Sequence, residues 1–413
     1  MNAVRRRRVL FLIATAELLS VSVWFSGTAV LPQLARLWET RPEQLAWVTT
    51  AVQLGFVAGA LLSAVFNLSD VFRTTTVFVV ASLGAAAANA GFGLAAETNL
   101  TAALALRFLT GAFLAGVYPP GMKILAGWYR DGRGLALGIL VGALTVGKAL
   151  PYAVEALGEL PWRTVVFATS GFAVLAALLV AAGVREGPHS APQAPVDFRQ
   201  VGEILRNRPL RLANFGYLGH MWELYAMWSW VGVLLAASAG HDSAGISLAA
   251  FFAIAAGGIG CVWAGRASDA AAPSRPEVSG AVGQRARVTI VAMSASGACC
   301  LLAALVFHNF YLLAAVCIVW GVAVVADSAQ FSTIVSEVAD RRYVGTALTL
   351  QTALGFLLTA VSIRVMAWVA AELGWRWALA ALALGPALGI AAMLPLLRAR
   401  SALSPEEKSG TIG

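Results

Sequence analysis

Long runs of apolar residues alternate with short polar gaps along the whole chain. Twelve apolar segments can be drawn, covering residues 9–31, 46–66, 75–96, 102–126, 134–157, 163–184, 211–237, 246–266, 288–307, 309–332, 343–369 and 375–397. Most are close to the roughly 20 residues that an α-helix needs to cross a bilayer. The pattern therefore predicts an all-α membrane protein with twelve transmembrane helices.

The segment 211–237 contains two ionisable residues in an otherwise apolar stretch. His220 and Glu223 are three positions apart, a spacing that puts both on one face of a helix. Charge at bilayer depth is costly, so residues of this kind usually face the protein interior and serve a function. We expect both side chains to face other helices or a water-filled cavity.

The composition fits a membrane protein, because 59% of the residues are apolar, 12% are charged and the mean hydropathy is +0.76. If the N-terminus is cytoplasmic, 21 of the 29 Lys and Arg residues fall in cytoplasmic gaps or tails. The opposite side holds Arg36, Arg41, Arg163 and Arg376, and the spans hold Arg107, Lys123, Lys148 and Arg364. This asymmetry predicts that both termini are cytoplasmic. The net charge of +8 therefore reports topology, and no nucleic-acid partner is expected.

The N-terminal basic run, Arg5–Arg8, precedes an apolar stretch and could be taken for a secretory signal peptide. Glu17 interrupts that stretch and no small-residue cleavage site follows, so we interpret it as the first transmembrane helix. The four cysteines all fall inside spans, which indicates small buried residues rather than disulfides. No metal site and no cofactor is expected.

The two halves of the chain repeat several residue pairs in the same order. The matches are Glu17 and Trp24 with Glu223 and Trp230, Gly59 and Asp70 with Gly258 and Asp269, Asp131 and Arg133 with Asp340 and Arg342, and Glu159-Leu-Pro-Trp-Arg163 with Glu372-Leu-Gly-Trp-Arg376. Such an order indicates a duplicated six-helix unit. We predict an N-terminal six-helix bundle at residues 1–186, a cytoplasmic linker at 187–210, a C-terminal six-helix bundle at 211–397 and a cytoplasmic tail at 398–413.

Two kinds of motif accompany this repeat. The loop after the eighth span reads Gly265-Arg-Ala-Ser-Asp269, and its counterpart, Phe66-Asn-Leu-Ser-Asp70-Val-Phe-Arg73, keeps the Asp but lacks the Gly. The fourth span contains Arg107-Phe-Leu-Thr-Gly111. With two six-helix halves and a long cytoplasmic loop, the whole chain resembles the major facilitator superfamily. The resemblance implies two bundles that rock around a midplane site, with Asp70, Arg73 and Asp269 as cytoplasmic latches between helices.

The resemblance leaves the subfamily open. Thr28-Ala-Val-Leu-Pro32 at the end of the first span is similar to proton-coupled drug antiporters, but the Gly-Pro of the antiporter motif is missing from the fifth span. The chain also has a general resemblance to the nitrate/nitrite and cyanate porter group. Against nitrate, the second span contains no Arg.

The carboxylates Glu17 and Glu223 occupy equivalent positions in the first helix of each half. Burial favours the protonated form of a carboxyl group, so either is a candidate for proton coupling. The alternative is a structural carboxylate hydrogen-bonded across helices. His220 titrates near neutrality when unperturbed, so it is a candidate for a proton relay or a substrate contact, unless a neighbouring hydroxyl caps it.

The basic residues Lys148 and Arg107 lie inside the fifth and fourth spans. A basic residue at that depth needs an anionic partner, which is either a protein carboxylate or a substrate. Pro151 cannot donate to the carbonyl of Gly147, so we expect the helix to open beside Lys148. For Arg107, the alternative is that it braces the packing of the first helix on the fourth.

Four further residues are candidates for the substrate cavity. Tyr217 and Trp230 lie broadly on the same side of their helix as His220. Asp327 and Gln351 are polar residues of the tenth and eleventh spans, for which hydrogen bonding between helices is the alternative.

These observations together predict a secondary active transporter that uses alternating access. We expect proton coupling and a small organic anion as substrate, with proton-coupled multidrug efflux as the alternative and a transport-dead sensor or scaffold as a remote one. No motif of an enzyme is found. The expected setting is a monomer in the lipid bilayer of a bacterial inner membrane.

Overall fold

The computed structural model describes residues 3–39, 42–66, 68–129, 132–158, 160–189, 201–238, 243–270, 278–340 and 344–402. Within these ranges the chain is helical and forms no β-strand. The helices are α1 (Ala3–Val21), η1 (Ser22–Trp24), α2 (Ser26–Ala29), α3 (Leu31–Trp38), α4 (Pro42–Val65), α5 (Leu68–Val71), α6 (Thr74–Ala95), α7 (Leu100–Leu114), α8 (Tyr118–Trp128), α9 (Arg133–Glu155), α10 (Trp162–Gly183), α11 (Val201–Arg206), α12 (Arg208–Ser238), α13 (Ser243–Ala255), α14 (Gly257–Ala270), α15 (Val278–Val306), α16 (Phe310–Ala326), α17 (Ser328–Val338), α18 (Val344–Leu373), α19 (Trp375–Leu382) and α20 (Leu384–Ala402).

The all-α prediction is confirmed. In the described part of the chain, 10 helical segments are long and apolar enough to cross a membrane. The expected segments 9–31 and 211–237 are helical too but are not among the ten. They are the first helix of each predicted half. The first is interrupted after Val21, and α1 includes the four arginines Arg5–Arg8, whereas polar residues such as His220 and Glu223 lower the hydropathy of the second. The count of twelve membrane-spanning helices therefore stays a prediction.

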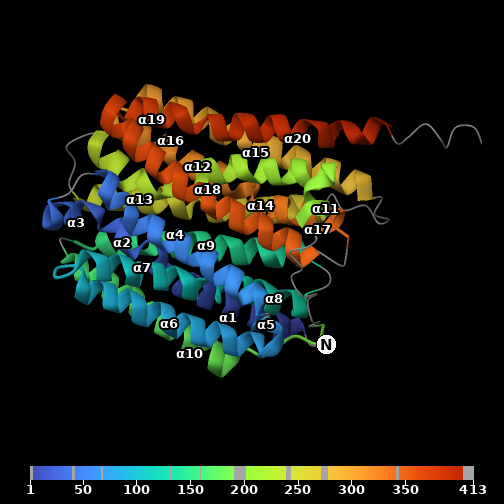
Figure 1. Cartoon of the computed structure of the whole chain (residues 1–413), viewed down its shortest axis with the longest axis horizontal. Helices are drawn as coiled ribbons and strands as arrows, with labels where there is room; N and C mark the ends of the chain where they lie inside the picture. The colour runs from blue at the N-terminus through green and yellow to red at the C-terminus, as the bar shows by residue number, and fades with distance from the viewer. Residues whose placement is uncertain are drawn as a thin grey trace, which may run out of the picture.

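The helices form two layers that follow the order of the chain, as Figure 1 shows: most of α1 to α10, in blue to green, lie below, and most of α12 to α20, in yellow-green to red, lie above. Within the first layer α4 packs on α7 and α6 on α10; within the second, α12 packs on α20 and α15 on α16. Contact between the layers runs through α4 with α18, and through α9 with α13 and α14. The arrangement agrees with two bundles, while the exact boundaries stay predictions because residues 190–200 of the linker and 403–413 of the tail lie outside the described ranges.

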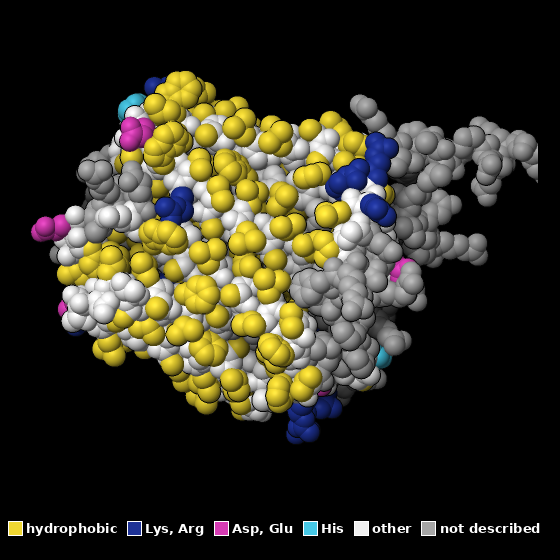
Figure 2. Space-filling model, in the orientation of Figure 1, with side chains coloured by type: hydrophobic (Ala, Val, Ile, Leu, Met, Phe, Trp, Pro, Cys, Tyr) yellow, Lys and Arg dark blue, Asp and Glu magenta, His cyan; other side chains and the backbone are white. Residues whose placement is uncertain are grey.

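The outer surface of the helices is apolar. Hydrophobic side chains cover most of the face seen in Figure 2, and Lys and Arg side chains gather mainly at its right-hand edge. Large side chains such as Leu178 and Leu305 are exposed on the outside of α10 and α15. An apolar surface of this extent is unfavourable in water but is matched by lipid tails. The chain is therefore an integral membrane protein.

Two spans differ from what the sequence predicts. The first span breaks at Ser22–Trp24, where a 3-10 turn separates α1 from α2. The expected opening of the fifth span at Pro151 is wrong, since α9 runs without interruption from Arg133 to Glu155. Proline removes a single N–H donor, and a membrane helix tolerates that loss when its neighbours hold it in place.

Glycines allow α9 to pack closely against α14 near the start of α9. A Cβ atom on Gly138 would lie 2.9 Å from the carbonyl oxygen of Cys261, and one on Gly265 would lie 2.8 Å from that of Gly134. Small residues of this kind let helix backbones approach each other. We call the contact of Gly134, Gly138 and Gly142 with α14 the glycine seam. It joins the two layers at one end of the molecule.

The structure adds a pair to the internal repeat. Asn99 and Asn309 cap α7 and α16 in the same way, because each side-chain oxygen accepts a hydrogen bond from the backbone N–H three residues later, at 2.9 Å and 3.1 Å. Trp162 and Trp375 likewise begin α10 and α19. Equivalent caps at equivalent spans support the duplicated unit.

Candidate functional site

Lys148 of α9 lies in a buried aromatic cluster between the two layers. Its ammonium nitrogen is 4.1 Å from the ring centre of Trp24, 4.5 Å from that of Tyr225 and 5.1 Å from that of Trp228. It also donates a hydrogen bond to the Tyr225 hydroxyl. We call these four residues the Lys148 cage. Cation–π contacts contribute about 2 kcal/mol for a desolvated cation, which offsets part of the cost of burying a side chain that is 1% exposed.

Two donors of the cage have no acceptor among the described residues. Among the described residues, no carboxylate forms an ion pair with Lys148. The indole N–H groups of Trp24 and Trp228 are buried and find no acceptor in the same set of residues. Each unpaired buried donor costs about 1–3 kcal/mol. A group rich in acceptors, such as an anion, would complement this arrangement.

Glu17 of α1 lies beside the cage. A Cβ atom on Gly147 would lie 2.2 Å from the carbonyl oxygen of Leu18, so the backbones of α9 and α1 touch one residue away from Lys148 and Glu17. The two side chains interact electrostatically. Glu17 is fully buried, and neither carboxyl oxygen has a hydrogen-bond donor in the described part of the protein.

Arg107 of α7 has a different environment, with every guanidinium nitrogen bonded to a neutral acceptor. The acceptors are the carbonyl oxygens of Val23 at 3.0 Å, Val48 at 3.3 Å and Trp24, with Ser26 Oγ at 3.1 Å and Asn89 Oδ1 at 3.0 Å. Carbonyls at a helix break need such donors. The contacts therefore favour the bracing alternative, in which Arg107 holds the broken first span against its neighbours.

Glu223 of α12 is the equivalent of Glu17 but is fully hydrogen-bonded. Its carboxyl group accepts hydrogen bonds from Ser296 Oγ at 2.9 Å, from Cys300 Sγ at 3.2 Å and from the Trp320 indole. These donors come from α15 and α16. The geometry therefore matches the structural alternative for Glu223, whereas Glu17 has no hydrogen-bond donor among the described residues.

His220 and Asp327 form a buried pair at the junction of α12 with α16 and α17. His220 Nδ1 lies 2.9 Å from Asp327 Oδ1. The contact lacks the alignment of a hydrogen bond, and His220 Nε2 also has no partner among the residues described. The Tyr217 and Phe331 rings are 6.0 Å and 5.6 Å from the imidazole. The pair is thus a second polar centre, confined to the second layer.

The other predicted residues lie outside the cage. Trp230 donates to the carbonyl oxygen of Ile363 at 2.9 Å and packs on Trp375, so its contacts are those of helix packing. Gln351 accepts a hydrogen bond from Ser332 at 3.4 Å. Among the predicted latches, Arg73 is exposed at the start of α6, while the side chains of Asp70 and Asp269 lie outside the described residues.

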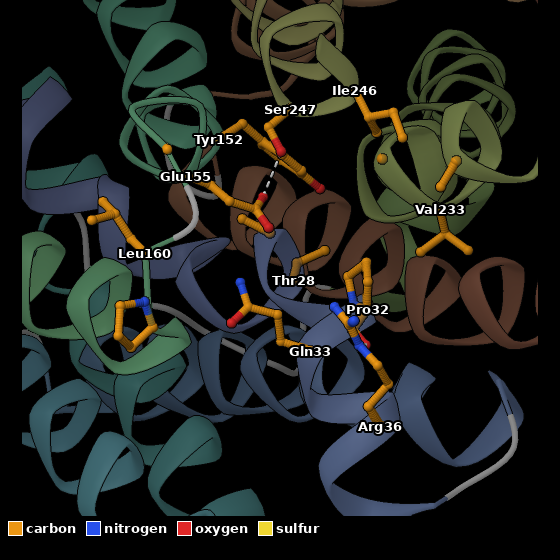
Figure 3. A pocket seen from close by; sticks show the side chains of 15 residues that line it. Thr28, Pro32, Gln33, Arg36, Tyr152, Glu155, Leu160, Val233, Ile246 and Ser247 are labelled. Atoms are coloured by element: carbon orange, nitrogen blue, oxygen red, sulfur yellow. Dashed lines mark hydrogen bonds between the residues drawn. The ribbon is translucent and has the colours of Figure 1, made fainter. Parts of the chain in front are cut away.

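A cavity of about 560 Å³ opens between the layers at the end of α9. We call it the vestibule. Figure 3 shows polar side chains on its wall, with Ser247 of α13 bonded to Glu155 of α9 at 2.8 Å. Gln33 lies below the Glu155 carboxylate, and Arg36 lies beside Pro32. The volume falls in the range of small-molecule sites.

The vestibule lies one helical turn from the Lys148 cage on α9 and α12, and four residues after Trp24 in the broken first span. Its lining includes Thr28, Tyr152 and Gly232. Each lies four residues after a member of the cage, since Trp24 precedes Thr28, Lys148 precedes Tyr152 and Trp228 precedes Gly232. Four residues of helix span about 6 Å. The Tyr152 ring fills the gap beside Gly232, where a Cβ atom would lie 3.0 Å from Tyr152 Cε1.

Sequence reasoning missed several residues of this region. Tyr225 and Trp228 were not among the predicted cavity residues, and Trp24 served only as a marker of the repeat. Asn89 was overlooked, although it donates to the Val166 carbonyl oxygen at 2.9 Å and links α6 to α10. Glu155 was overlooked as well. A lone amide or carboxyl group in an apolar span was the available signal for both.

Known proteins resemble the chain in sequence and in fold. The sequence profile of the Major Facilitator Superfamily matches residues 11–283. The uncharacterized transporter YgaY of Escherichia coli O157:H7, and its counterpart in strain K12, are each 30% identical over 257 residues. The match covers 58% of this chain and 60% of the relative, so this chain spans less than two thirds of the length of either relative.

Solved structures show the same fold at low sequence identity. The human organic anion transporter MFSD10 superimposes with a TM-score of 0.72 at 16% identity, over 95% of this chain and 100% of that one. A bacterial homologue of the human lysosomal transporter Spinster, inward-facing and unoccupied, gives 0.72 at 14% identity, over 97% and 98% of the two chains.

Proposed function

The chain belongs to the Major Facilitator Superfamily, and from that premise we propose that it is a secondary transporter of a small organic anion, coupled to protons. The observation that carries this proposal is the Lys148 cage. Its buried cation has aromatic neighbours and a hydroxyl but no carboxylate as an ion-pair partner among the described residues. An anion would supply the missing charge.

Glu17 provides the coupling to protons. A buried carboxylate without donors is very costly, whereas the neutral acid costs far less. When Glu17 ionises, its nearest source of compensation is Lys148, so the carboxylate and the substrate anion compete for one cation. Protonation of Glu17 frees Lys148 for the anion, and the two therefore cross together.

Alternating access follows from the contacts between the layers. The glycine seam closes one end of the interface, and the vestibule opens the other. With the cytoplasmic N-terminus predicted from charge, the seam is cytoplasmic and the described state faces outward. Rocking of the two bundles then exposes the cage to each side in turn. We place the transporter in a bacterial inner membrane and expect it to act as a monomer.

Proteoliposomes with an internal pH dye test this function. Addition of an organic anion is expected to drive proton uptake, and Lys148→Met is expected to abolish both anion flux and proton movement. Glu17→Gln should keep anion exchange but lose accumulation driven by a pH gradient. Lys123→Met serves as a matched control, because Lys123 is a half-buried lysine of α8 outside the cage. Normal anion flux in Lys148→Met would refute the assignment.

A second candidate, efflux of amphipathic cations, is favoured by the vestibule. Its wall carries the Glu155 carboxylate next to apolar side chains such as Val233 and Ile246. Expression in a drug-sensitive host separates the two functions. Broad resistance that disappears in Glu155→Gln would favour efflux, and unchanged sensitivity would favour the anion transporter.

A further inference from the structure

We propose that the anion taken by the Lys148 cage is an aromatic monocarboxylate. This inference rests on the proposed function, since it names the chemical class of the anion at the same site. It follows from the charge at the cage, the hydrogen-bond donors that lack acceptors and the aromatic rings that surround them.

The charge at the site matches a single negative group. Lys148 is the one basic residue of the cage, and the guanidinium of Arg107 is already bonded to backbone carbonyls and neutral side chains. A dianion would leave one buried charge without compensation, which is costly. A monoanion leaves none.

The donors at the site match a carboxylate. A carboxylate has two oxygens with about four acceptor positions. The Lys148 ammonium and the indole N–H groups of Trp24 and Trp228 are donors without acceptor capacity, and both indoles lack acceptors within the described chain. These three donors belong to α9, η1 and α12, so a carboxylate that accepts hydrogen bonds from all three would contact both layers.

The walls of the site match a flat apolar body. Phe56 of α4 and Phe356 of α18 extend the cage, with ring centres 4.5 Å apart. Trp24 lies 4.9 Å from Phe56 and 5.7 Å from Phe356, and Tyr225 lies 5.1 Å from Phe356. Two of these four contacts, Phe56 with Phe356 and Trp24 with Phe356, cross from one layer to the other.

Contacts that cross the interface must break when the bundles separate. Phe56 and Phe356 then lose their contact with each other, while Phe56 keeps Trp24 and Phe356 keeps Tyr225 as ring neighbours. An aromatic substrate can restore a ring contact on each side. A small inorganic anion such as nitrate leaves these faces uncovered. A polyhydroxylated acid brings hydroxyl groups for which the rings offer no partner. The site therefore selects an aromatic ring on a carboxylate.

Calorimetric titration of the purified full-length protein in detergent tests this class with four probes. Benzoate is expected to bind about tenfold more tightly than cyclohexanecarboxylate, as one or two ring contacts would provide. Nitrate should bind more weakly still, and uncharged benzamide should not bind measurably. Phe356→Leu is expected to reduce the preference for benzoate to less than about threefold, with cyclohexanecarboxylate affinity unchanged. Phe11→Leu, an exposed position on α1, should match the wild type.

The possible failures are distinguishable. Equal affinity for benzoate and cyclohexanecarboxylate would overturn the aromatic class and leave anion transport in place. The same holds if Phe356→Leu keeps the full preference. If Lys148→Met binds all three anions as the wild type does, the anion site itself is refuted and the proposed function fails with it.

Discussion

Alanine at Gly138 is expected to open the glycine seam. The added Cβ atom would lie 2.9 Å from the Cys261 carbonyl oxygen and 3.4 Å from the Cα atom of Gly265. Both atoms belong to the α14 backbone, so the helices must separate by a few tenths of an ångström. Overpacking of this kind costs about 1–3 kcal/mol, which corresponds to about 5- to 150-fold in an equilibrium constant.

This cost falls on the state in which the seam is closed and not on the state in which it is open. Gly138→Ala should therefore shift the population toward the open seam. The effect is graded, because a Cβ atom on Gly142 would lie 3.2 Å from the Gly258 carbonyl oxygen, a milder contact. At Gly171 of α10 no atom of a described residue lies within 4 Å of the added Cβ, which makes Gly171→Ala the matched control.

Maleimide labelling of Cys261 measures the shift. This residue lies at the seam and is 5% exposed, so it should react only when α14 separates from α9. With the other three cysteines replaced by serine, the labelling rate should rise by about tenfold in Gly138→Ala, less in Gly142→Ala and not in Gly171→Ala. A rate in Gly138→Ala that equals the Gly171→Ala rate would refute the closed-seam reasoning.

Further predictions concern the buried charges. Arg107→Gln should lower the free energy of unfolding by about 3 kcal/mol or more, because the carbonyl groups at the break in the first span lose charged donors. An unchanged Tm in detergent would contradict the role of Arg107 in holding this span in place. Glu223→Gln should cost about 2 kcal/mol, because an oxygen that accepts hydrogen bonds becomes an NH2 donor. Glu17→Gln should cost less than about 1 kcal/mol, because neither Glu17 oxygen accepts a hydrogen bond from a described residue; equal Tm shifts would count against the assignment. A double-mutant cycle of His220→Asn and Asp327→Asn should give a coupling of about 1 kcal/mol, and strict additivity would show that the pair does not interact.

Apolar periodicity and repeated motifs predicted much of the fold. Runs of apolar residues indicate membrane helices because lipid cannot satisfy backbone hydrogen bonds, so a long apolar segment must form them internally. The repeat of Glu17 and Trp24 in Glu223 and Trp230 pointed to two equivalent units. Neither signal locates a break that depends on tertiary contacts. The turn at Ser22–Trp24 is stabilised by Arg107, which lies more than 80 positions later.

The repeat was less informative about the site, because equivalent positions have different contacts. Trp24 faces Lys148, whereas Trp230 packs on Trp375. Within the described part of the chain, Glu17 has no hydrogen-bond donor and Glu223 has three. A sequence repeat records common ancestry of the two units, but each unit meets different neighbours.

The sequence by itself determined that the chain is helical and membrane-embedded, that it is built from a repeated unit, and that a few ionisable residues are buried in apolar spans. Those properties follow from the local cost of placing polar groups in lipid. Tertiary structure alone decided which buried charges have partners. Arg107 meets backbone carbonyls, while Lys148 meets aromatic rings and the Tyr225 hydroxyl. Whether a buried charge is paired depends on side chains from helices distant in sequence, and their orientation is set only when the helices pack.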